Sequence, residues 1–152
     1  MAISVLTIGF LGVVTLLSKA LGLNRVVADN YIGTYLAAEG IEVAKNILDT
    51  NLIQKTSWSQ GFSDGDYEVD YQSTALQPYQ DRTLSFDGGT GHYAYQEGYT
   101  PTSYKRKVTV KLIADAGVQV NEIQVNSEVS WITRGGGTFS INLEDHFFNW
   151  RQ

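Results

Sequence analysis

The first 17 residues of the chain, MAISVLTIGFLGVVTLL, contain no charged side chain. Their only polar side chains are Ser4, Thr7 and Thr15, so a helix formed by this segment is apolar on every face. Such a helix must be enclosed by lipid or by other helices, and one domain of ordinary size is too small to wrap it. As a helix, the segment extends about 26 Å, slightly less than the ~30 Å hydrocarbon core of a bilayer. It therefore predicts a short membrane span, or part of a longer one.

The segment does not fit a cleaved secretory signal. A signal peptide carries basic residues before its apolar run and a small-residue cleavage site after it. Here the first cation, Lys19, follows the run, and Ser18-Lys19-Ala20 matches the cleavage pattern poorly. We therefore expect the apolar segment to remain part of the protein.

The helical pattern continues well beyond the apolar segment. No proline occurs before residue 78, and good helix formers dominate LAAEGIEVAKNILDTN. These features predict one nearly continuous helix from about Ala2 to Leu52. Gly9, Gly12 and Gly22 each cost about 1 kcal/mol relative to alanine, so we expect the helix to stretch or melt locally there.

The second half of this helix carries two apolar stripes. One contains Ile32, Leu36, Val43 and Ile47, and the other contains Ala37, Ile41, Ala44 and Leu48. Two stripes predict two partners, one being the chain's own sheet and the other the helices of neighbouring subunits. The four-residue spacing of small residues, Gly33 with Ala37 and Gly40 with Ala44, favours close helix approach.

After Lys55 the pattern changes to strands and turns. A short strand is expected at 67–71, and an exposed glycine turn at FDGGTGHY. Apolar residues then alternate with polar ones at 108–112 and 123–131, and the Gly135–Gly137 turn leads to a last strand at 139–143. The fold class predicted is α+β, a long N-terminal helix packed on a small antiparallel sheet. The expected division is a helix over residues 1–54 and a β head over 55–152.

The helix and the closing strands resemble one known family. AISVLTIGFLGVVTLL followed by NRVVADNYIGTYLAAEGIEVAKNILDTN is similar to the long helix of type IV pilins and of the pseudopilins of type II secretion. VNSEVSWITRGGGTFSINLEDHFFNWR is similar to the last strands of minor pilins and pseudopilins. The resemblance implies subunits that wait in the inner membrane, are extracted by an assembly machinery, and pack helix to helix in a homopolymer with their heads outward.

The assembly interface expected from this resemblance is the apolar side of the long helix. It comprises Ile3, Val5, Leu6, Ile8, Phe10, Leu11, Val13, Val14, Leu16, Leu17, Leu21, Ala37, Ile41 and Ala44. The maturation motif of the family, a basic leader ending in glycine and a glutamate near the mature N-terminus, is not found here, because the first acidic residue is Asp29. We expect that residues precede Met1, and the alternative is an atypical family member.

Other chemistry finds little support in the sequence. The net charge of −5 and the pI near 4.9 argue against nucleic-acid binding, and the basic run Lys105–Lys107 is read as the solvated start of a strand. There is no cysteine, and no cofactor or catalytic constellation is expected. Asp64, Asp66 and Asp70 alternate like calcium ligands, although the glycine and terminal glutamate of an EF-hand loop are missing. They form a weak calcium candidate, and the alternative is the polar face of a strand.

The function expected is therefore structural and not enzymatic. The chain is predicted to be a type IV pilus subunit at the cell surface, with its head exposed for adhesion, motility or uptake. Two alternatives stay open: a pseudopilin of a type II secretion system, and a membrane-anchored binding module that does not polymerise.

Overall fold

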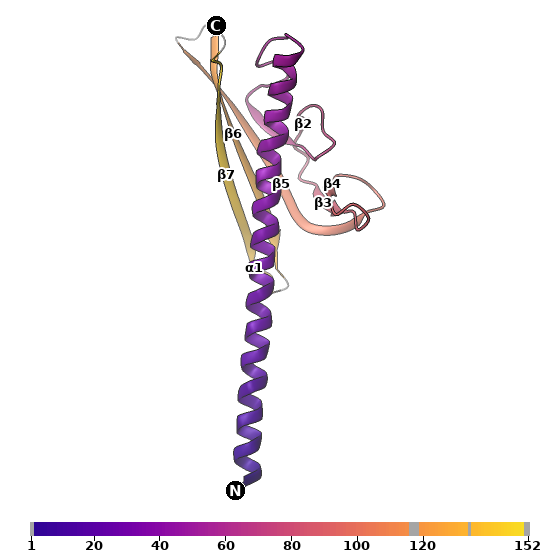
Figure 1. The fold of residues 1–152 in the computed structure, drawn as a ribbon, viewed down its shortest axis with the longest axis vertical. Helices are drawn as coiled ribbons and strands as arrows, with labels where there is room; N and C mark the ends of the chain where they lie inside the picture. Colours follow the sequence, from indigo (N-terminus) through magenta and orange to yellow (C-terminus); the bar gives the residue numbers. More distant parts are fainter. Residues whose placement is uncertain (1, 116–118, 134, 151–152) are drawn as a thin grey trace. The chain divides into compact units, whose positions relative to one another are not determined.

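The computed structural model describes residues 2–115, 119–133 and 135–150. It begins with helix α1, Ala2–Ile53, which agrees with the predicted helix to within one residue. The strands are β1 Gly65–Glu68, β2 Gln77–Pro78, β3 Thr83–Phe86, β4 Tyr93–Ala94, β5 Thr100–Asp115, β6 Gln119–Ile132 and β7 Thr138–Phe148. The fold is α+β, with the long N-terminal helix packed on an antiparallel sheet (Figure 1). The predicted fold class is confirmed.

The chain forms two compact units, Met1–Ile32 and Gly33–Gln152. The expected division at residue 54 follows the secondary structure, whereas packing divides the chain after Ile32. The second unit, called the head below, contains residues 33–53 of α1 together with the sheet. The first unit is the N-terminal part of α1, which includes the apolar segment and, after it, the charged residues Lys19, Arg25 and Asp29.

Strand β5 is the centre of the sheet. On one side it pairs with β6, which pairs in turn with β7, giving the predicted antiparallel meander (Figure 1). On its other side β5 pairs with β1 and, further towards its start, with β3. The two-residue strands β2 and β4 extend this second side. All of these pairings are antiparallel.

The side-chain alternation along β5 and β6 places one face of the sheet against the helix. Val108 and Val110 of β5 are buried, and Val110 lies opposite Val125 of β6. The intervening Thr109 and Lys111 point away from the core, as period-two alternation requires. The predicted inward and outward faces of these two strands are confirmed.

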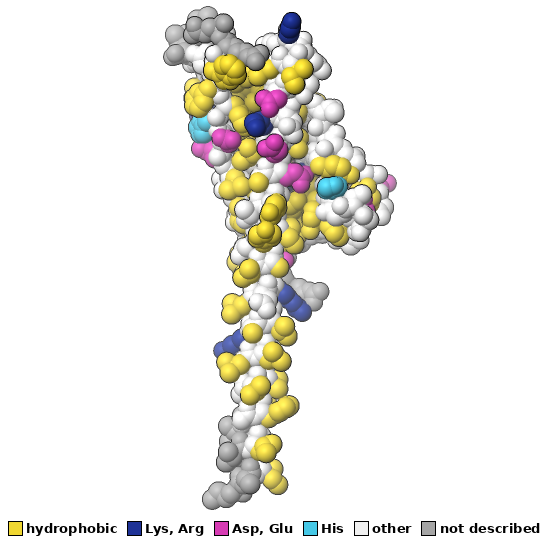
Figure 2. Space-filling view, viewed as in Figure 1, with side chains coloured by type: hydrophobic (Ala, Val, Ile, Leu, Met, Phe, Trp, Pro, Cys, Tyr) yellow, Lys and Arg dark blue, Asp and Glu magenta, His cyan; other side chains and the backbone are white. Residues whose placement is uncertain are grey.

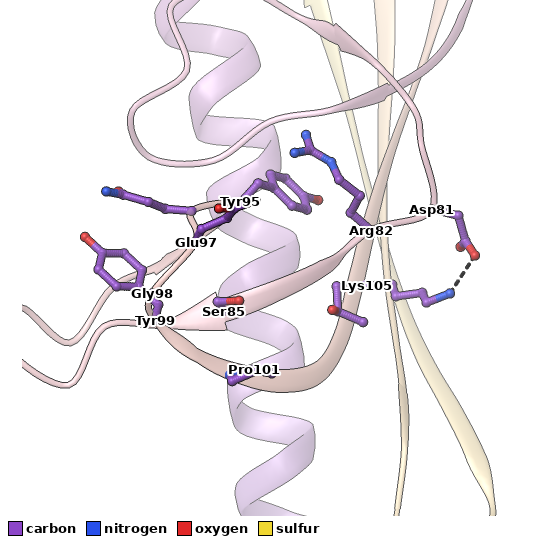
Figure 3. Close-up of a pocket in the computed structure, with 11 residues that line it drawn as sticks. Asp81, Arg82, Ser85, Tyr95, Glu97, Gly98, Tyr99, Pro101 and Lys105 are labelled. Atoms are coloured by element: carbon purple, nitrogen blue, oxygen red, sulfur yellow. Dashed lines mark hydrogen bonds and ion pairs between the residues drawn. The ribbon is translucent and has the colours of Figure 1, made fainter.

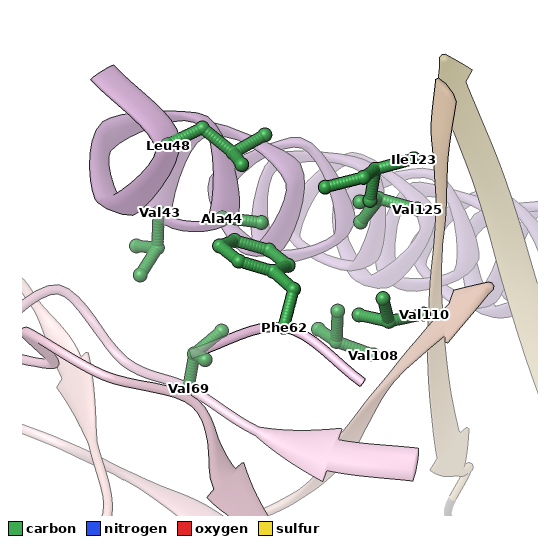
Figure 4. Close-up of a cluster of buried hydrophobic side chains, with 9 residues drawn as sticks. All are labelled: Val43, Ala44, Leu48, Phe62, Val69, Val108, Val110, Ile123 and Val125. Atoms are coloured by element: carbon green, nitrogen blue, oxygen red, sulfur yellow. The ribbon is translucent and has the colours of Figure 1, made fainter. Parts of the chain in front are cut away.

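The hydrophobic core lies between this sheet face and residues 43–48 of α1 (Figure 4). Its members come from the helix, from the segment around β1, and from β5 and β6. They are Val43, Ala44, Leu48, Phe62, Val69, Val108, Val110, Ile123 and Val125. Trp131, near the end of β6, is also buried and packs directly against α1, because a Cβ built on Gly33 would lie 2.6 Å from its ring.

The prediction of two separate partners for the two helix stripes is wrong. Ala37 and Ala44, two members of the expected subunit interface, are fully buried within the head, and Ile41 packs against its core. The stripes are neighbours on the helix surface, so one twisted sheet covers both. The small residues at 33, 37, 40 and 44 thus allow close packing of the helix on the chain's own sheet.

The interpretation of the basic run Lys105–Lys107 as the solvated start of a strand is wrong for Arg106. Its side chain is completely buried, because residue 106 occupies an inward position of β5 between Tyr104 and Val108. Its guanidinium donates to the carbonyl oxygen of Leu36, in the helix, at 2.9 Å and to that of Val69 at 3.0 Å. It also forms an ion pair with Glu39 at 3.3 Å. The buried charge is therefore compensated by several acceptors and joins three segments of the head.

Candidate assembly surface and polar clusters of the head

The first unit exposes large apolar side chains along its whole described length (Figure 2). Ile3 is 81% exposed, Phe10 is 66% exposed and Leu16 is 69% exposed. The remaining described members of the predicted interface in this unit are exposed as well: Leu6, Leu11, Val13, Val14, Leu17 and Leu21. The side chains of Val5 and Ile8 are outside the described part of the structure. Because consecutive residues are exposed, the apolar surface surrounds the helix.

This exposed surface is too costly to be left in water. Twelve large apolar side chains between residues 3 and 27 are exposed in the described structure. Fully burying one such side chain is worth about 1.5–3 kcal/mol, and these are 37–81% exposed, so covering all of them stabilises the protein by about 10–20 kcal/mol. That is as large as the whole stability of a typical domain, about 5–15 kcal/mol. From Gly9 onward, α1 is long and apolar enough to cross a membrane, by length and composition, and no residue of its most apolar stretch is buried.

The helix continues without a break through Gly9, Gly12 and Gly22. A Cβ built on any of the three meets open space within the chain, so no packing inside this protein requires glycine at these positions. Local stretching at these glycines stays a prediction. Because each glycine lowers helix stability by about 1 kcal/mol relative to alanine, stretching of the helix should begin at these positions.

The structure does not support the calcium candidate, because the three carboxylates bond to different neighbours. Asp64 accepts a hydrogen bond from the backbone of Leu112, and Asp66 accepts one from the Thr109 hydroxyl at 2.6 Å. Asp70 caps the turn that follows it and accepts from the backbone of Tyr95. Within the described residues, no group of three or more acidic or histidine side chains is arranged to hold a metal ion. These aspartates tie loops to the sheet instead.

The glycine segment around residue 90 forms the connection from β3 to β4, as an exposed turn. The amide of Asp87 donates to the carbonyl of His92, and the Asp87 carboxylate accepts from Gly89 and Thr90. The hydrogen bond from the Thr90 hydroxyl, followed by that from the Gly89 amide, lowers the pKa of Asp87. The predicted exposed turn is confirmed.

A buried carboxylate closes the β1–β2 side of the head. The side chain of Glu68 is fully buried and accepts from the backbone amides of Gln80 and Arg82. Its second oxygen is 2.7 Å from Nε of Arg82, whose guanidinium lies 4.6 Å from the centre of the Tyr95 ring. Burial raises the pKa of Tyr95 to about 12. Glu68 thus fixes the position of Arg82 through contacts with its side chain and its backbone amide.

The face of the sheet away from the helix carries a histidine between two carboxylates. His146 of β7 lies beside Glu122 of the neighbouring β6 and Glu144 of its own strand, 3.1 Å from the latter. Hydrogen bonding to Glu122, then to Glu144, raises the pKa of His146 above 6.5. The same contact with His146 lowers the pKa of Glu144. When His146 is protonated, its ion pair with Glu122 joins the edge strand β7 to β6.

Sequence reasoning missed the two residues with the largest polar role in the head, Arg106 and Glu68. Arg106 belongs to a basic run, which favours a solvated position. The signal for its burial is its spacing, because residues two apart on a strand share a face and Arg106 is therefore on the same face as Val108 and Val110. Glu68 lies in the sequence between Asp66 and Asp70, and no local pattern distinguishes this buried acid from its neighbours.

Comparison of the chain with known proteins finds no matching family model, curated protein or solved structure.

Proposed function

We propose that the chain is the structural subunit of a filament of the type IV pilin kind. Residues of the apolar helix form the polymerising element, and the head is presented to the outside. The observation that carries the proposal is the apolar surface of residues 3–27, exposed on every side of the helix and joined in one chain to an independently packed head. The resemblance of this helix to the pilin helix supports the same proposal.

The physical argument concerns two environments for one helix. An apolar helix without charge in its first 17 residues is stable in a bilayer, where its backbone is internally bonded. It is equally protected in a bundle of identical helices. Transfer from lipid to a filament core therefore keeps the same side chains dry, and the machinery that extracts the subunit need not expose them to water.

The first experiment is electron microscopy of material sheared from cells that make the protein, with mass spectrometry of the intact subunit. Long thin filaments containing this chain are the expected result. A chain that stays in the membrane fraction as a monomer would refute polymerisation and support the anchored binding module. Short filaments confined to the envelope would support the pseudopilin.

A substitution pair tests the role of the helix surface. Leu11→Lys introduces a charge into the apolar segment at a cost of about 2.5–3.5 kcal/mol at mid-bilayer, and we expect the variant to be lost from filaments. Asn46→Lys, on an exposed position of α1 within the head, is the matched control and should assemble normally. Equal incorporation of both variants would contradict the proposal.

A further inference from the structure

The head contains an open depression between the β4–β5 loop and the strands β3 and β5, with a volume of about 640 Å³. This volume lies in the range of small-ligand sites, about 300–1,000 Å³. Figure 3 shows Glu97, Gly98 and Tyr99 of the loop on one side, Ser85 at the centre, and Arg82 and Lys105 on the other side. All the lining residues belong to the head, so the depression is formed within one unit.

The floor and walls of the depression combine aromatic and polar surface. Tyr95 and Tyr99 line it together with Pro101, and these rings are flat apolar surfaces of the kind on which the C–H face of a ring can pack. Tyr95 is held in place because its hydroxyl donates to the carbonyl of Arg106 at 3.1 Å. An aromatic surface fixed in this way loses little conformational entropy when a ligand binds.

Several polar groups in the depression have no partner in the described structure. The side chains of Ser85, Gln96 and Glu97, which line it, form no hydrogen bond with other described residues. The guanidinium of Arg82 is held through Nε by buried Glu68 and lies beside Tyr95, and its terminal nitrogens have no acceptor among the described side chains. A ligand can therefore bond to donors and to acceptors here. The guanidinium donates, the carboxylate accepts, and the amide and the hydroxyl do both.

The charges of the depression argue against an anionic ligand. Lys105 is paired with Asp81 at 2.6 Å, and Arg82 is paired with Glu68 at 2.7 Å. The Glu97 carboxylate is then left over, so a phosphate or a carboxylate ligand would meet this negative charge, while the charges of both cations that line the depression, Arg82 and Lys105, are already neutralised by their partners. A neutral ligand with several hydroxyl groups satisfies Glu97, Gln96 and Ser85 without this repulsion.

We propose that this depression binds a neutral saccharide, with one sugar ring packed on the tyrosine surface and its hydroxyls bonded to Glu97, Gln96 and the terminal nitrogens of Arg82. A saccharide would be the ligand of a head exposed outside the cell, and in this respect the inference rests on the proposed function. Binding by the isolated subunit, however, does not require a filament, so the two proposals fail separately.

The test uses the full chain as a monomer in micelles of a detergent without a sugar head group, such as dodecylphosphocholine. Lactose, maltose and diacetylchitobiose are titrated at millimolar concentration, and binding is followed by backbone amide shifts of the β4–β5 loop. We expect at least one disaccharide to shift the amides of Gly98 and Tyr99. No shift with any of the three would overturn the inference, even if the protein forms filaments.

Two variants locate the site. Glu97→Ala removes an exposed carboxylate with no partner within the described residues, so folding should be unchanged, and affinity should fall about tenfold. Gln96→Ala should also weaken binding, and Glu42→Ala, at an exposed position of α1, is the matched control. Unchanged affinity in both loop variants would place the sugar elsewhere and refute the assignment.

Discussion

The contact between Gly40 and Ser127 gives the sharpest prediction about stability. Ser127 occupies an inward position of β6, and its hydroxyl is buried without a hydrogen-bond partner, the one such side-chain atom found in the described residues. A Cβ built on Gly40 would overlap this hydroxyl and would lie 3.0 Å from Cδ of Arg106. The two residues should therefore respond to substitution as a pair.

The expected free energies follow from these contacts. Ser127→Ala removes an unsatisfied polar group, whose burial costs about 1–3 kcal/mol, so the variant should be about 1 kcal/mol more stable than the parent. Gly40→Ala gains about 1 kcal/mol of helix propensity but overpacks the site at a cost of about 1–3 kcal/mol. We expect Gly40→Ala to cost about 1 kcal/mol net in the parent and to change stability very little when it is combined with Ser127→Ala.

The assay is urea unfolding of the full chain in detergent, followed by tryptophan fluorescence, for the parent, both single variants and the double variant. A coupling free energy of about 1–2 kcal/mol is expected, because the clashing atom is absent in the double variant. Ser130→Ala, on the opposite face of β6, is the control and should change stability little. Strict additivity of the two substitutions, within about 0.5 kcal/mol, would refute the reasoning.

Three further predictions concern the interior and the sheet edge. Arg106→Met should destabilise the head by about 3–5 kcal/mol, because it leaves buried acceptors unpaired, whereas Lys107→Met on the other face should change urea stability little. The raised pKa of His146 contributes stability that is complete below about pH 6.5 and is lost as pH rises through the folded-state value. His146→Gln should flatten this part of the stability profile, and an unchanged profile would exclude the contact as its cause. Gly33→Ala should lower the thermal midpoint, because its Cβ would clash with the Trp131 ring, and an unchanged or raised midpoint would contradict that packing.

The long elements of the fold could be predicted from the sequence, because their periodicity extends over many residues. Composition is enough to locate α1, and alternation of apolar and polar residues is enough to locate β5 and β6. The short strands were harder to predict. β2 and β4 contain two residues each and carry no period, and the expected strand at 67–71 is displaced to Gly65–Glu68. Its ladder ends there because the carbonyl of Val69 accepts from the Arg106 side chain.

The polar sites depend on contacts between distant parts of the chain, and here prediction failed. Arg106 meets Leu36 across 70 positions and Val69 across 37, and no local pattern encodes such a pairing. The spacing of Asp64, Asp66 and Asp70 suggested one ligand set, yet tertiary contacts give each aspartate a different donor. The apolar segment was easier, since its composition alone requires an enclosing partner.

The position at which packing divides the chain has a practical consequence for handling the protein. Every buried residue of the described structure lies at Gly33 or later, so a cut just before this glycine removes the apolar segment and spares the whole interior. The shorter polypeptide should dissolve without detergent and keep its tertiary structure. The head buries its apolar side chains within the chain itself, whereas the apolar helix before Gly33 needs lipid or other protein to cover its side chains.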